Sequence, residues 1–331
     1  MKNVAPARKR DRALSVDPRA ACGVRAARAR ASRRGWHAAG SRWGRLGPLL
    51  AFALLLLVVG AAAADEGQIE RGRYIFAISG GCGCHTATSG RLNAGGRALE
   101  TPFGVFYGTN ITPDPAHGIG RWSDEEIVDS IRLGLGPGGS ALNPVMPYPA
   151  FSGMADEDVL ALVAYLRSVP AVARENRGHE PRFPLSDLLS GLWRWLFFSP
   201  ARPPAKAPAE GVDRGRYSVE HVAHCGQCHT PRTALGRLDR SLHLAGNSQG
   251  LGGEVAPNIT PDPETGIGTW SQGDIAALLR TGFKPNADNV QGLMAVLVDG
   301  PPLGFKDMTR QDALAVAAYL KSIRPIRRSL D

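Results

Sequence analysis

The feature that most constrains how this chain folds is an internal repeat. Short stretches of the first half recur in the second half in the same order: Arg-Gly-Arg-Tyr (71–74 and 214–217), Asn-Ile-Thr-Pro-Asp-Pro (110–115 and 258–263), Gly-Ile-Gly-x-Trp (118–122 and 266–270) and Ala-Tyr-Leu (164–166 and 318–320). Ordered matches over so long a stretch indicate a tandem duplication. We therefore expect two similar domains, at residues 65–175 and 211–331, joined by a linker at residues 176–210.

Each copy predicts short helices joined by loops rich in Gly and Pro. One helix in each copy begins at a capping box, and another closes the copy with apolar residues at helical spacing. The capping boxes are Ser123 with Glu126 and Ser271 with Asp274, the helices after them are expected to end near Leu133 and Leu279, and the closing helices are Asp158–Val169 and Thr309–Ile323. No segment shows a convincing period-2 alternation, so the sequence predicts a mainly α fold without strands.

The linker contains two different segments. Phe183–Phe198 is predicted to be an amphipathic helix rich in aromatic residues, and Ser199–Pro208 is a stiff, Pro-rich stretch. Two interpretations of the helix stay open. It docks on a membrane surface or a partner protein, because aromatic residues favour such interfaces, or it packs between the two domains.

Residues 1–64 are expected to be a basic tail followed by a signal peptide or a membrane anchor. Pro48–Ala64 is an uncharged stretch that ends in Ala62-Ala63-Ala64, the small-residue pattern of a signal-peptidase site. Its length is also the short end of what a membrane span needs, so an anchor stays an alternative. We expect the rest of the chain to be exported to the periplasm, either free or anchored to the inner membrane.

The positive charge of the chain lies almost entirely in this tail. Residues 1–46 hold 13 of the 39 Lys and Arg but only two of the 30 acidic residues. Beyond residue 46 the acidic residues therefore outnumber the basic ones by two. The net charge of +9 thus indicates no basic binding surface on the folded part, and no nucleic-acid partner is expected.

The strongest chemical signal is the motif Cys225-x-x-Cys228-His229. Two thiols at this spacing can add to the two vinyl groups of a haem, while the adjacent imidazole reaches the iron. The alternative is half of a zinc site, but a second, independent pair of ligands is missing. We expect covalent attachment of one haem c through Cys225 and Cys228, with His229 as an axial iron ligand.

The first copy carries a shortened version of the motif, Cys82-x-Cys84-His85. Cys84 keeps its position relative to His85 and is expected to form one thioether. Cys82 either reaches the second vinyl group across a tighter loop, which Gly81 and Gly83 would permit, or stays free. The alternative is that this copy has lost its haem and serves as a scaffold. The favoured expectation is a second covalently bound haem c, with His85 on its iron.

Methionines at equivalent places in the two copies are candidates for the sixth iron ligand. Met146 and Met294 form one pair, and Met154 and Met308, just before the closing helices, form the other. A loop position and the distance from the haem histidine favour Met146 and Met294, which predicts that the other pair packs in the core. His/Met ligation saturates the iron and suits electron transfer better than substrate binding.

Other repeated residues are candidates for the walls of the haem pockets. The Asn-Ile-Thr-Pro-Asp-Pro loops either donate hydrogen bonds to haem propionates or the axial Met, or form plain Asx turns. Three arginines either pair with propionates or face solvent. The expected aromatic walls are Tyr74, Trp122, Tyr165, Tyr217, Trp270 and Tyr319, and the arginines are Arg97, Arg132 and Arg280.

With these motifs, residues 66–325 resemble the dihaem members of the class I cytochrome c family that are similar to the cytochrome c subunits of membrane-bound alcohol and gluconate dehydrogenases. The carrying residues are Cys225–Pro231, both Asn-Ile-Thr-Pro-Asp and Gly-Ile-Gly-x-Trp runs, Met146-Pro147-Tyr148, Gly292-Leu293-Met294 and the two Ala-Tyr-Leu endings. The resemblance implies two tandem class I cytochrome c domains and a periplasmic location. It also implies electron transfer from a dehydrogenase subunit towards quinone, another cytochrome or a terminal oxidase.

Two departures limit this resemblance. The best-known dehydrogenase subunits carry three haems, whereas this chain has two motifs and the first is shortened, so the dehydrogenase it serves stays open. A dihaem enzyme, such as a peroxidase or a sulfur-compound oxidase, is the alternative function. Such an enzyme needs one iron with an open distal position, whereas each copy here offers a Met. A scaffold subunit in which only the second haem works is a third possibility. The sequence favours an electron carrier.

Overall fold

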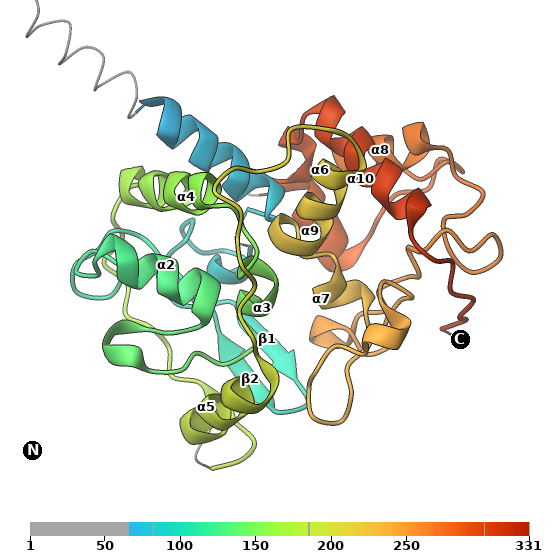
Figure 1. Cartoon of the computed structure of the whole chain (residues 1–331). Coiled ribbons are helices and arrows are strands. Elements are labelled where there is room, and N and C mark those ends of the chain that lie inside the picture. Colours follow the sequence, from blue (N-terminus) through green and yellow to red (C-terminus); the bar gives the residue numbers. More distant parts are fainter. Residues whose placement is uncertain (1–65, 82, 185, 301, 331) are drawn as a thin grey trace, which may run out of the picture. The chain divides into compact units, whose positions relative to one another are not determined.

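The structure is a computed structural model that describes residues 66–330 except 82, 185 and 301, and all of these residues fall in one compact unit (Figure 1). The expectations for residues 1–64 and for Cys82 lie outside the described residues. The described chain is mainly helical, which confirms the predicted fold class. None of its helices is both long enough and apolar enough to cross a membrane.

The helices are short, and most occur in both copies of the repeat. The first copy contains a helix at residues 66–78, the 3₁₀ turns η2 (Gly83–His85) and η3 (Pro137–Gly139), and the helices α2 (Asp124–Leu133), α3 (Tyr148–Phe151) and α4 (Asp156–Ser168). The helix α5 (Ser186–Phe197) follows. The second copy contains α6 (Gly211–Tyr217), the π-helical turn η4 (Ser218–Val222), α7 (Gly226–His229), the 3₁₀ turns η5 (Arg240–Leu242), η6 (Leu251–Gly253) and η7 (Phe305–Asp307), and the helices α8 (Gln272–Thr281), α9 (Gly292–Asp299) and α10 (Arg310–Ser322).

Capping boxes begin α2 and α8, as predicted. The Ser123 hydroxyl accepts from the Glu126 backbone N–H at 3.1 Å, and the Glu126 carboxylate accepts from the Ser123 backbone N–H at 2.8 Å. The equivalent box begins α8. α2 ends where predicted. α8 runs further, to Thr281, because the left-handed residue that caps it, Gly282 with φ of 76°, comes only there.

A small antiparallel sheet shows that the expectation of no strands was wrong. β1 (Ala98–Thr101) and β2 (Gly104–Tyr107) form a hairpin, and β3 (Glu180–Pro181) pairs with β2. Thr101 lies opposite Gly104 at the turn, and its hydroxyl donates to the Gly104 carbonyl at 2.9 Å. Strands of four residues are too short to show a clear alternation of apolar and polar residues, so the sequence pattern could not reveal them.

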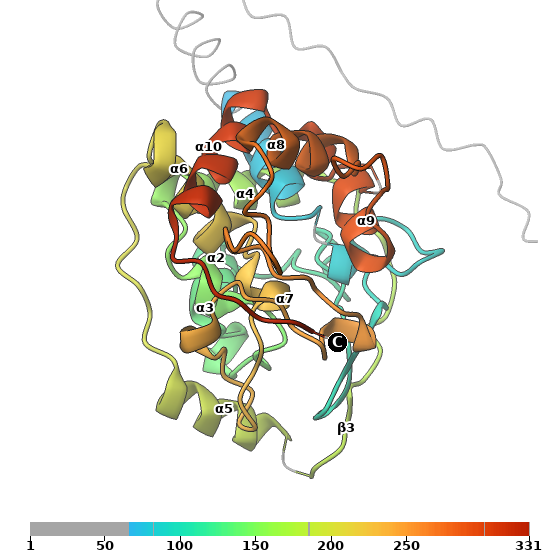
Figure 2. The same ribbon diagram turned by 90° about the vertical axis from the view of Figure 1, so that its right-hand side faces the viewer.

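The repeated glycine of Arg-Gly-Arg-Tyr lets the first and last helices of each copy cross closely. A Cβ at Gly72 would lie 1.9 Å from the carbonyl oxygen of Ala161 in α4, and a Cβ at Gly215 would lie 1.9 Å from that of Ala315 in α10. Any side chain larger than hydrogen would collide with that carbonyl, so glycine is required at both crossings. Figure 2 shows the second of these pairs, α6 beside α10.

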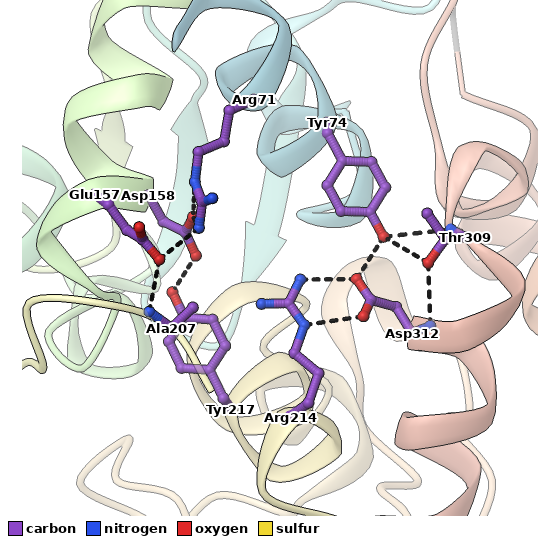
Figure 3. A network of polar contacts seen from close by, with 9 residues as sticks. All are labelled: Arg71, Tyr74, Glu157, Asp158, Ala207, Arg214, Tyr217, Thr309 and Asp312. Atoms are coloured by element: carbon purple, nitrogen blue, oxygen red, sulfur yellow. Dashed lines mark hydrogen bonds and ion pairs between the residues drawn. The ribbon is translucent and has the colours of Figure 1, made fainter. Parts of the chain in front are cut away.

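Polar contacts between the two copies follow the same repeated stretch (Figure 3). The tyrosine of each Arg-Gly-Arg-Tyr donates a hydrogen bond to an aspartate of the other copy, and that aspartate pairs with the arginine of its own copy. The contacts are Tyr74 to Asp312 (2.5 Å), Arg214 to Asp312 (2.7 Å), Tyr217 to Asp158 (2.6 Å) and Arg71 to Asp158 (2.7 Å). We call these six residues the tyrosine clasp. It joins the two copies through a pattern that each copy contributes equally.

The helix predicted after the first copy exists as α5, and one of its faces contacts both copies. Arg194 Nε donates to the Leu133 carbonyl at 2.7 Å, and Trp193 Nε1 donates to the Leu235 carbonyl at 2.8 Å. The opposite face is open and apolar, with Trp195 77 % exposed. The other exposed apolar residues of α5 are Leu188, Leu189, Leu192 and Leu196. The structure therefore contains features of both interpretations of this helix, packing against the copies on one face and an unpartnered apolar surface on the other.

Candidate haem sites

The second Cys-His motif forms a single tight turn. The N–H groups of Cys228 and His229 both donate to the Cys225 carbonyl, at 3.2 and 3.0 Å, and α7 covers the last four residues of the motif. The N–H of Cys225 in turn donates to the Val219 carbonyl at 3.0 Å. The local hydrogen bonds therefore hold both thiols and the imidazole on one short stretch of backbone.

In both motifs the histidine ring is held by the same kind of hydrogen bond. Nδ1 of His229 lies 2.7 Å from the carbonyl oxygen of Pro257, and Nδ1 of His85 lies 2.8 Å from that of Thr109. A carbonyl only accepts, so Nδ1 carries the proton and Nε2 keeps its lone pair for a metal. Burial lowers the pKa of both rings and favours the neutral form that binds iron.

The first motif is shorter and ends in the 3₁₀ turn η2, where the Thr86 N–H donates to the Gly83 carbonyl at 3.2 Å. Burial raises the pKa of the Cys84 thiol, which is therefore a neutral thiol like its counterparts in the second motif. Gly108 packs directly on the Cys84 carbonyl, where a Cβ would lie 1.9 Å from the oxygen. The structure thus describes Cys84 and His85 and leaves the role of Cys82 as a prediction.

The first motif affects the electrostatics of the second and lies against the second copy. Burial raises the pKa of Cys228 to about 11, and Cys84 contributes to that rise. Burial also raises the pKa of Cys225 to about 12. The loop before the first motif packs on the second copy, since a Cβ at Gly80 would lie 2.6 Å from the Leu297 side chain. The first attachment site therefore packs on α9 of the second copy, where a Cβ at Gly83 would also lie 4.0 Å from Val296.

The two candidate axial methionines differ in their local structure. Met146 lies in a turn in which its N–H donates to the Asn143 carbonyl at 3.0 Å, and α3 begins two residues later. Met294 lies in the first turn of α9, which corrects the expectation of a loop at this position. Its helix begins there because the Glu254 carboxylate accepts from the Leu293 N–H at 2.7 Å, next to Met294. Both methionines are partly exposed and pack against the core.

The other methionine pair is fully buried in the apolar core, with Met154 0 % and Met308 1 % exposed. The carbonyls of these two residues accept from arginine side chains of α2 and α8: Arg132 donates to Met154, and Arg280 donates to Met308 at 2.9 Å. These two arginines are therefore engaged with the backbone. Arg280 is also exposed, as the solvent interpretation expects, whereas Arg132 is only partly exposed.

The Asn-Ile-Thr-Pro-Asp-Pro loops form Asx turns. Asn110 Oδ1 accepts from the N–H and the hydroxyl of Thr112, at 3.0 and 2.7 Å, and Asn258 does the same with Thr260. Asn110 Nδ2 donates to the Val172 carbonyl at 2.8 Å. Both amide ends of this side chain are thus used by the protein, which favours the turn interpretation over a bond to haem.

Two of the tyrosines expected in the pocket walls bond instead with the other copy. Tyr74 and Tyr217 reach across to the other copy in the tyrosine clasp. Tyr319 donates to Glu220 at 2.7 Å. Tyr165 packs on Phe76, and Trp122 and Trp270 pack partly buried against the core. Arg97 donates to the Thr86 carbonyl at 3.1 Å, directly after the first motif.

Sequence reasoning missed Glu254, which holds the N-terminus of α9 and contributes to the raised pKa of Cys228. Its contact with Leu293 spans 39 positions of the chain, and no local pattern marks it. It also missed Asn93, which lies 0 % exposed beside the first motif. A signal for Asn93 exists in the sequence, since the second copy has an apolar residue, Leu244, at the corresponding place.

The residues of both motifs fit a covalently bound haem. Each offers a half-buried imidazole with a fixed Nδ1 and a free Nε2. The described thiols before it are Cys84 in the first motif and Cys225 and Cys228 in the second, and these are the protein groups that a c-type haem uses. Across the described part of the chain, no three His, Cys, Asp or Glu side chains converge as ligands for a metal ion of their own.

Comparison with known proteins agrees with this fit. The chain is 38 % identical to a dihaem c-type cytochrome of Cereibacter sphaeroides over 266 residues, which cover 78 % of this chain and 87 % of that protein. The chain belongs to the cytochrome c family. No protein-family model matches this cytochrome.

This cytochrome is also similar to larger subunits of dehydrogenases. It is 39 % identical to the cytochrome c subunit of the alcohol dehydrogenase (quinone) of Gluconacetobacter polyoxogenes and 35 % identical to the gluconate 2-dehydrogenase cytochrome c subunit of Pantoea cypripedii. The matches cover 80 % and 83 % of this chain, which spans 57 % and 64 % of those two proteins. Membership of the family implies covalently bound haem c, and these relatives support electron transfer as the function.

Proposed function

We propose that this chain is a dihaem cytochrome c that carries electrons from a periplasmic dehydrogenase subunit towards quinone, another cytochrome or a terminal oxidase. The observation that carries the proposal is the equivalent anchoring of His85 and His229, each with Nδ1 bound to a backbone carbonyl in a Cys-His turn. The names of the relatives, cytochrome subunits of alcohol, gluconate and fructose dehydrogenases, support a dehydrogenase as electron donor.

In this proposal the two copies are class I cytochrome c domains, at residues 65–175 and 211–331, and the Pro-rich segment links them. Cys84, and Cys82 if it reaches, hold the first haem, and Cys225 and Cys228 hold the second. The axial pairs are His85 with Met146 and His229 with Met294. Each bound haem supplies a one-electron Fe(III)/Fe(II) couple.

The protein groups then do three things. The carbonyls of Thr109 and Pro257 keep the histidine rings oriented and neutral, the methionine sulfurs would serve as the second iron ligands, and the core residues against which the methionines pack would shield one side of each haem from water. Each copy offers a methionine for the distal iron position. We therefore propose that the chain is an electron carrier and not an enzyme with an open iron site. The packing of the loop before the first motif on Leu297 of the second copy supports electron exchange between the two sites.

The number of haems tests this proposal. A pyridine haemochrome assay on the exported protein is expected to give two haems per chain, and mass spectrometry of the haem peptides counts the thioethers at each motif. Cys84→Ala is expected to remove the first haem and leave the second in place, and Cys228→Ala is the matched change in the other motif. One haem per wild-type chain would contradict the dihaem function.

The methionine assignment is tested separately, by the weak far-red absorption that Met–Fe(III) ligation produces. Met146→Ala and Met294→Ala are each expected to remove one share of this band. Met308→Leu, a change of similar volume in the core, is the control and is expected to leave the band intact. Loss of the band in the control instead would move the ligand assignment to Met308.

We also propose that the open face of α5 docks the protein on an anionic membrane surface. The outward residues of α5 are apolar, with Trp195 at the most exposed position. The exposed Arg237 lies near the C-terminal end of α5, with its guanidinium 5.3 Å from the ring of Phe197, which stacks on Trp193. An amphipathic helix with one open apolar face is the pattern of a helix that lies in the plane of a bilayer surface, and a cation beside it favours anionic lipid. The periplasmic location and the signal peptide or anchor at Pro48–Ala64 belong to the same proposal.

A further inference from the structure

Asn93 and Leu244 occupy the same position in the two copies. Both have a left-handed backbone with φ of 60°, and both side chains are 0 % exposed. Their backbone hydrogen bonds also correspond. The N–H of Asn93 donates to the Thr86 hydroxyl (3.0 Å), and its carbonyl accepts from the Ile111 N–H (2.9 Å). In the same way, the N–H of Leu244 donates to the Thr230 hydroxyl (2.9 Å), and its carbonyl accepts from the Ile259 N–H (3.0 Å). The two positions therefore differ only in the side chain.

The two buried side chains differ in polarity. Leu244 belongs to the apolar core of the protein. Asn93 is equally buried, yet neither its Oδ1 nor its Nδ2 has a hydrogen-bond partner among the described residues. A buried amide without a partner is strongly disfavoured, since it has lost its bonds to water and gained none. Asn adopts a left-handed backbone more readily than Leu does, but Leu244 holds the same conformation in the second copy, so the turn itself does not require an amide. The Asn93 amide therefore needs a partner that the described protein atoms do not supply.

The backbone contacts locate Asn93 at the first haem site. Thr86, which binds the Asn93 N–H, directly follows His85. The Gly95 N–H, two residues after Asn93, donates to the His85 carbonyl at 2.7 Å. On its other side Asn93 binds Ile111, two residues after Thr109, whose carbonyl holds the His85 ring. Asn93 is thus enclosed between the two segments that position the axial histidine of the first site.

We propose that the Asn93 carboxamide is a positioning residue of the first haem site, where it makes a polar contact to the bound haem that the second site lacks. This inference rests on the proposed dihaem function. Ferric haem carries one more positive charge than ferrous haem, and a buried amide that turns its Oδ1 towards the iron favours the more highly charged form. The contact therefore lowers the reduction potential of the first haem relative to what an apolar residue would give, and makes the two haems of this chain inequivalent.

A reciprocal exchange between the copies tests the inference. Asn93→Leu reproduces the second copy at the first site and buries no unpaired polar group, so it is expected to fold. In a spectroelectrochemical titration of the dihaem protein it is expected to raise one of the two potentials by about 60 mV, a tenfold change in the redox equilibrium of a one-electron couple, and to leave the other unchanged. Leu244→Asn is expected to lower the other potential.

The outcomes separate this inference from the function on which it rests. If the haemochrome assay finds two haems and Asn93→Leu leaves both potentials as they were, the amide contacts another group, such as a buried water or Cys82, and the inference is wrong. If the assay finds a single haem, held by the second motif, the dihaem function itself fails. Movement of both potentials by the same amount would also overturn the inference, because a local contact at one site shifts one potential.

Discussion

The hydroxyl of Tyr74 donates a hydrogen bond of 2.5 Å to Oδ2 of Asp312, which lies 238 positions later in the chain. The same bond exists in reverse, from Tyr217 to Asp158 at 2.6 Å. Even the supporting contacts correspond, since the backbone N–H of Thr309 donates to Tyr74 and that of Ala155 donates to Tyr217. The duplicated sequence therefore uses one residue pattern twice, once in each direction, to join its two copies.

Removing the tyrosine hydroxyls is expected to loosen this joint. Tyr217→Phe leaves the fully buried Asp158 without one of its bonds and is expected to cost about 2 kcal/mol in free energy of unfolding, the usual range for a bond to a charged partner. Tyr74→Phe is expected to cost less, because its supporting bond from Thr309 is longer, 3.3 Å against 3.0 Å from Ala155. Urea unfolding followed by circular dichroism measures both. Equal stability of Tyr217→Phe and wild type would show that the clasp contributes nothing.

Asp312 makes the free energy of unfolding depend on pH in the acid range. Burial works to raise its pKa, but the bonds from Arg214 and Tyr74 outweigh burial and hold the pKa below its usual range. A carboxyl whose pKa is lower in the folded chain stabilises the fold above its unfolded pKa of about 3.9, and this stabilisation is lost as pH falls through the folded value. Asp312→Asn is therefore expected to be less stable at neutral pH and to lose less stability on acidification. Thermal unfolding at a series of pH values measures the slope, and parallel curves for the two proteins would contradict the prediction.

Because the helices cross so closely, a single added methyl group at a crossing is expected to lower the stability of the protein strongly. Gly215→Ala places Cβ 1.9 Å from the Ala315 carbonyl, so α6 and α10 must move apart, at a cost of about 1–3 kcal/mol or more. Gly273→Ala in α8 is the matched control, because its Cβ would meet only the Ser271 hydroxyl at 3.5 Å, and it is expected to be neutral or slightly stabilising. Thermal unfolding compares the two. Similar melting temperatures would show that the crossing tolerates a side chain.

The α5 surface predicts membrane binding that depends on its exposed side chains. Replacing Leu192 and Trp195 together by Gln is expected to reduce flotation of the exported protein with vesicles of anionic phospholipid, because less apolar surface enters the bilayer. Val255→Gln changes an apolar residue of intermediate exposure between those two, on a loop outside α5, and is expected to have no effect. Haem absorbance in the floated fraction gives the readout. Full flotation of the Leu192 and Trp195 variant would exclude α5 as the docking surface.

Much of the fold was predictable because its signals are local. The capping boxes lie within four residues, the closing helices show their period directly, and α5 appears where its amphipathic pattern predicts it. The hairpin β1–β2 was missed, because each strand has only four residues and their pairing comes from tertiary contacts. Met294 was expected in a loop, but a carboxylate 39 positions before Leu293 begins a helix there.

The sequence by itself determined the duplication, the mainly α class and the two Cys-His motifs, since all of these depend on spacing along the chain. Only the tertiary structure decided what the repeated residues do. The tyrosines expected in the pocket walls exchange partners between the copies, the arginines bind the carbonyls of the buried methionines, and Asn93 and Leu244 occupy one position with opposite polarity. These roles arise from contacts between residues far apart in sequence, and a pattern of residue types carries no information about which distant group a side chain will meet.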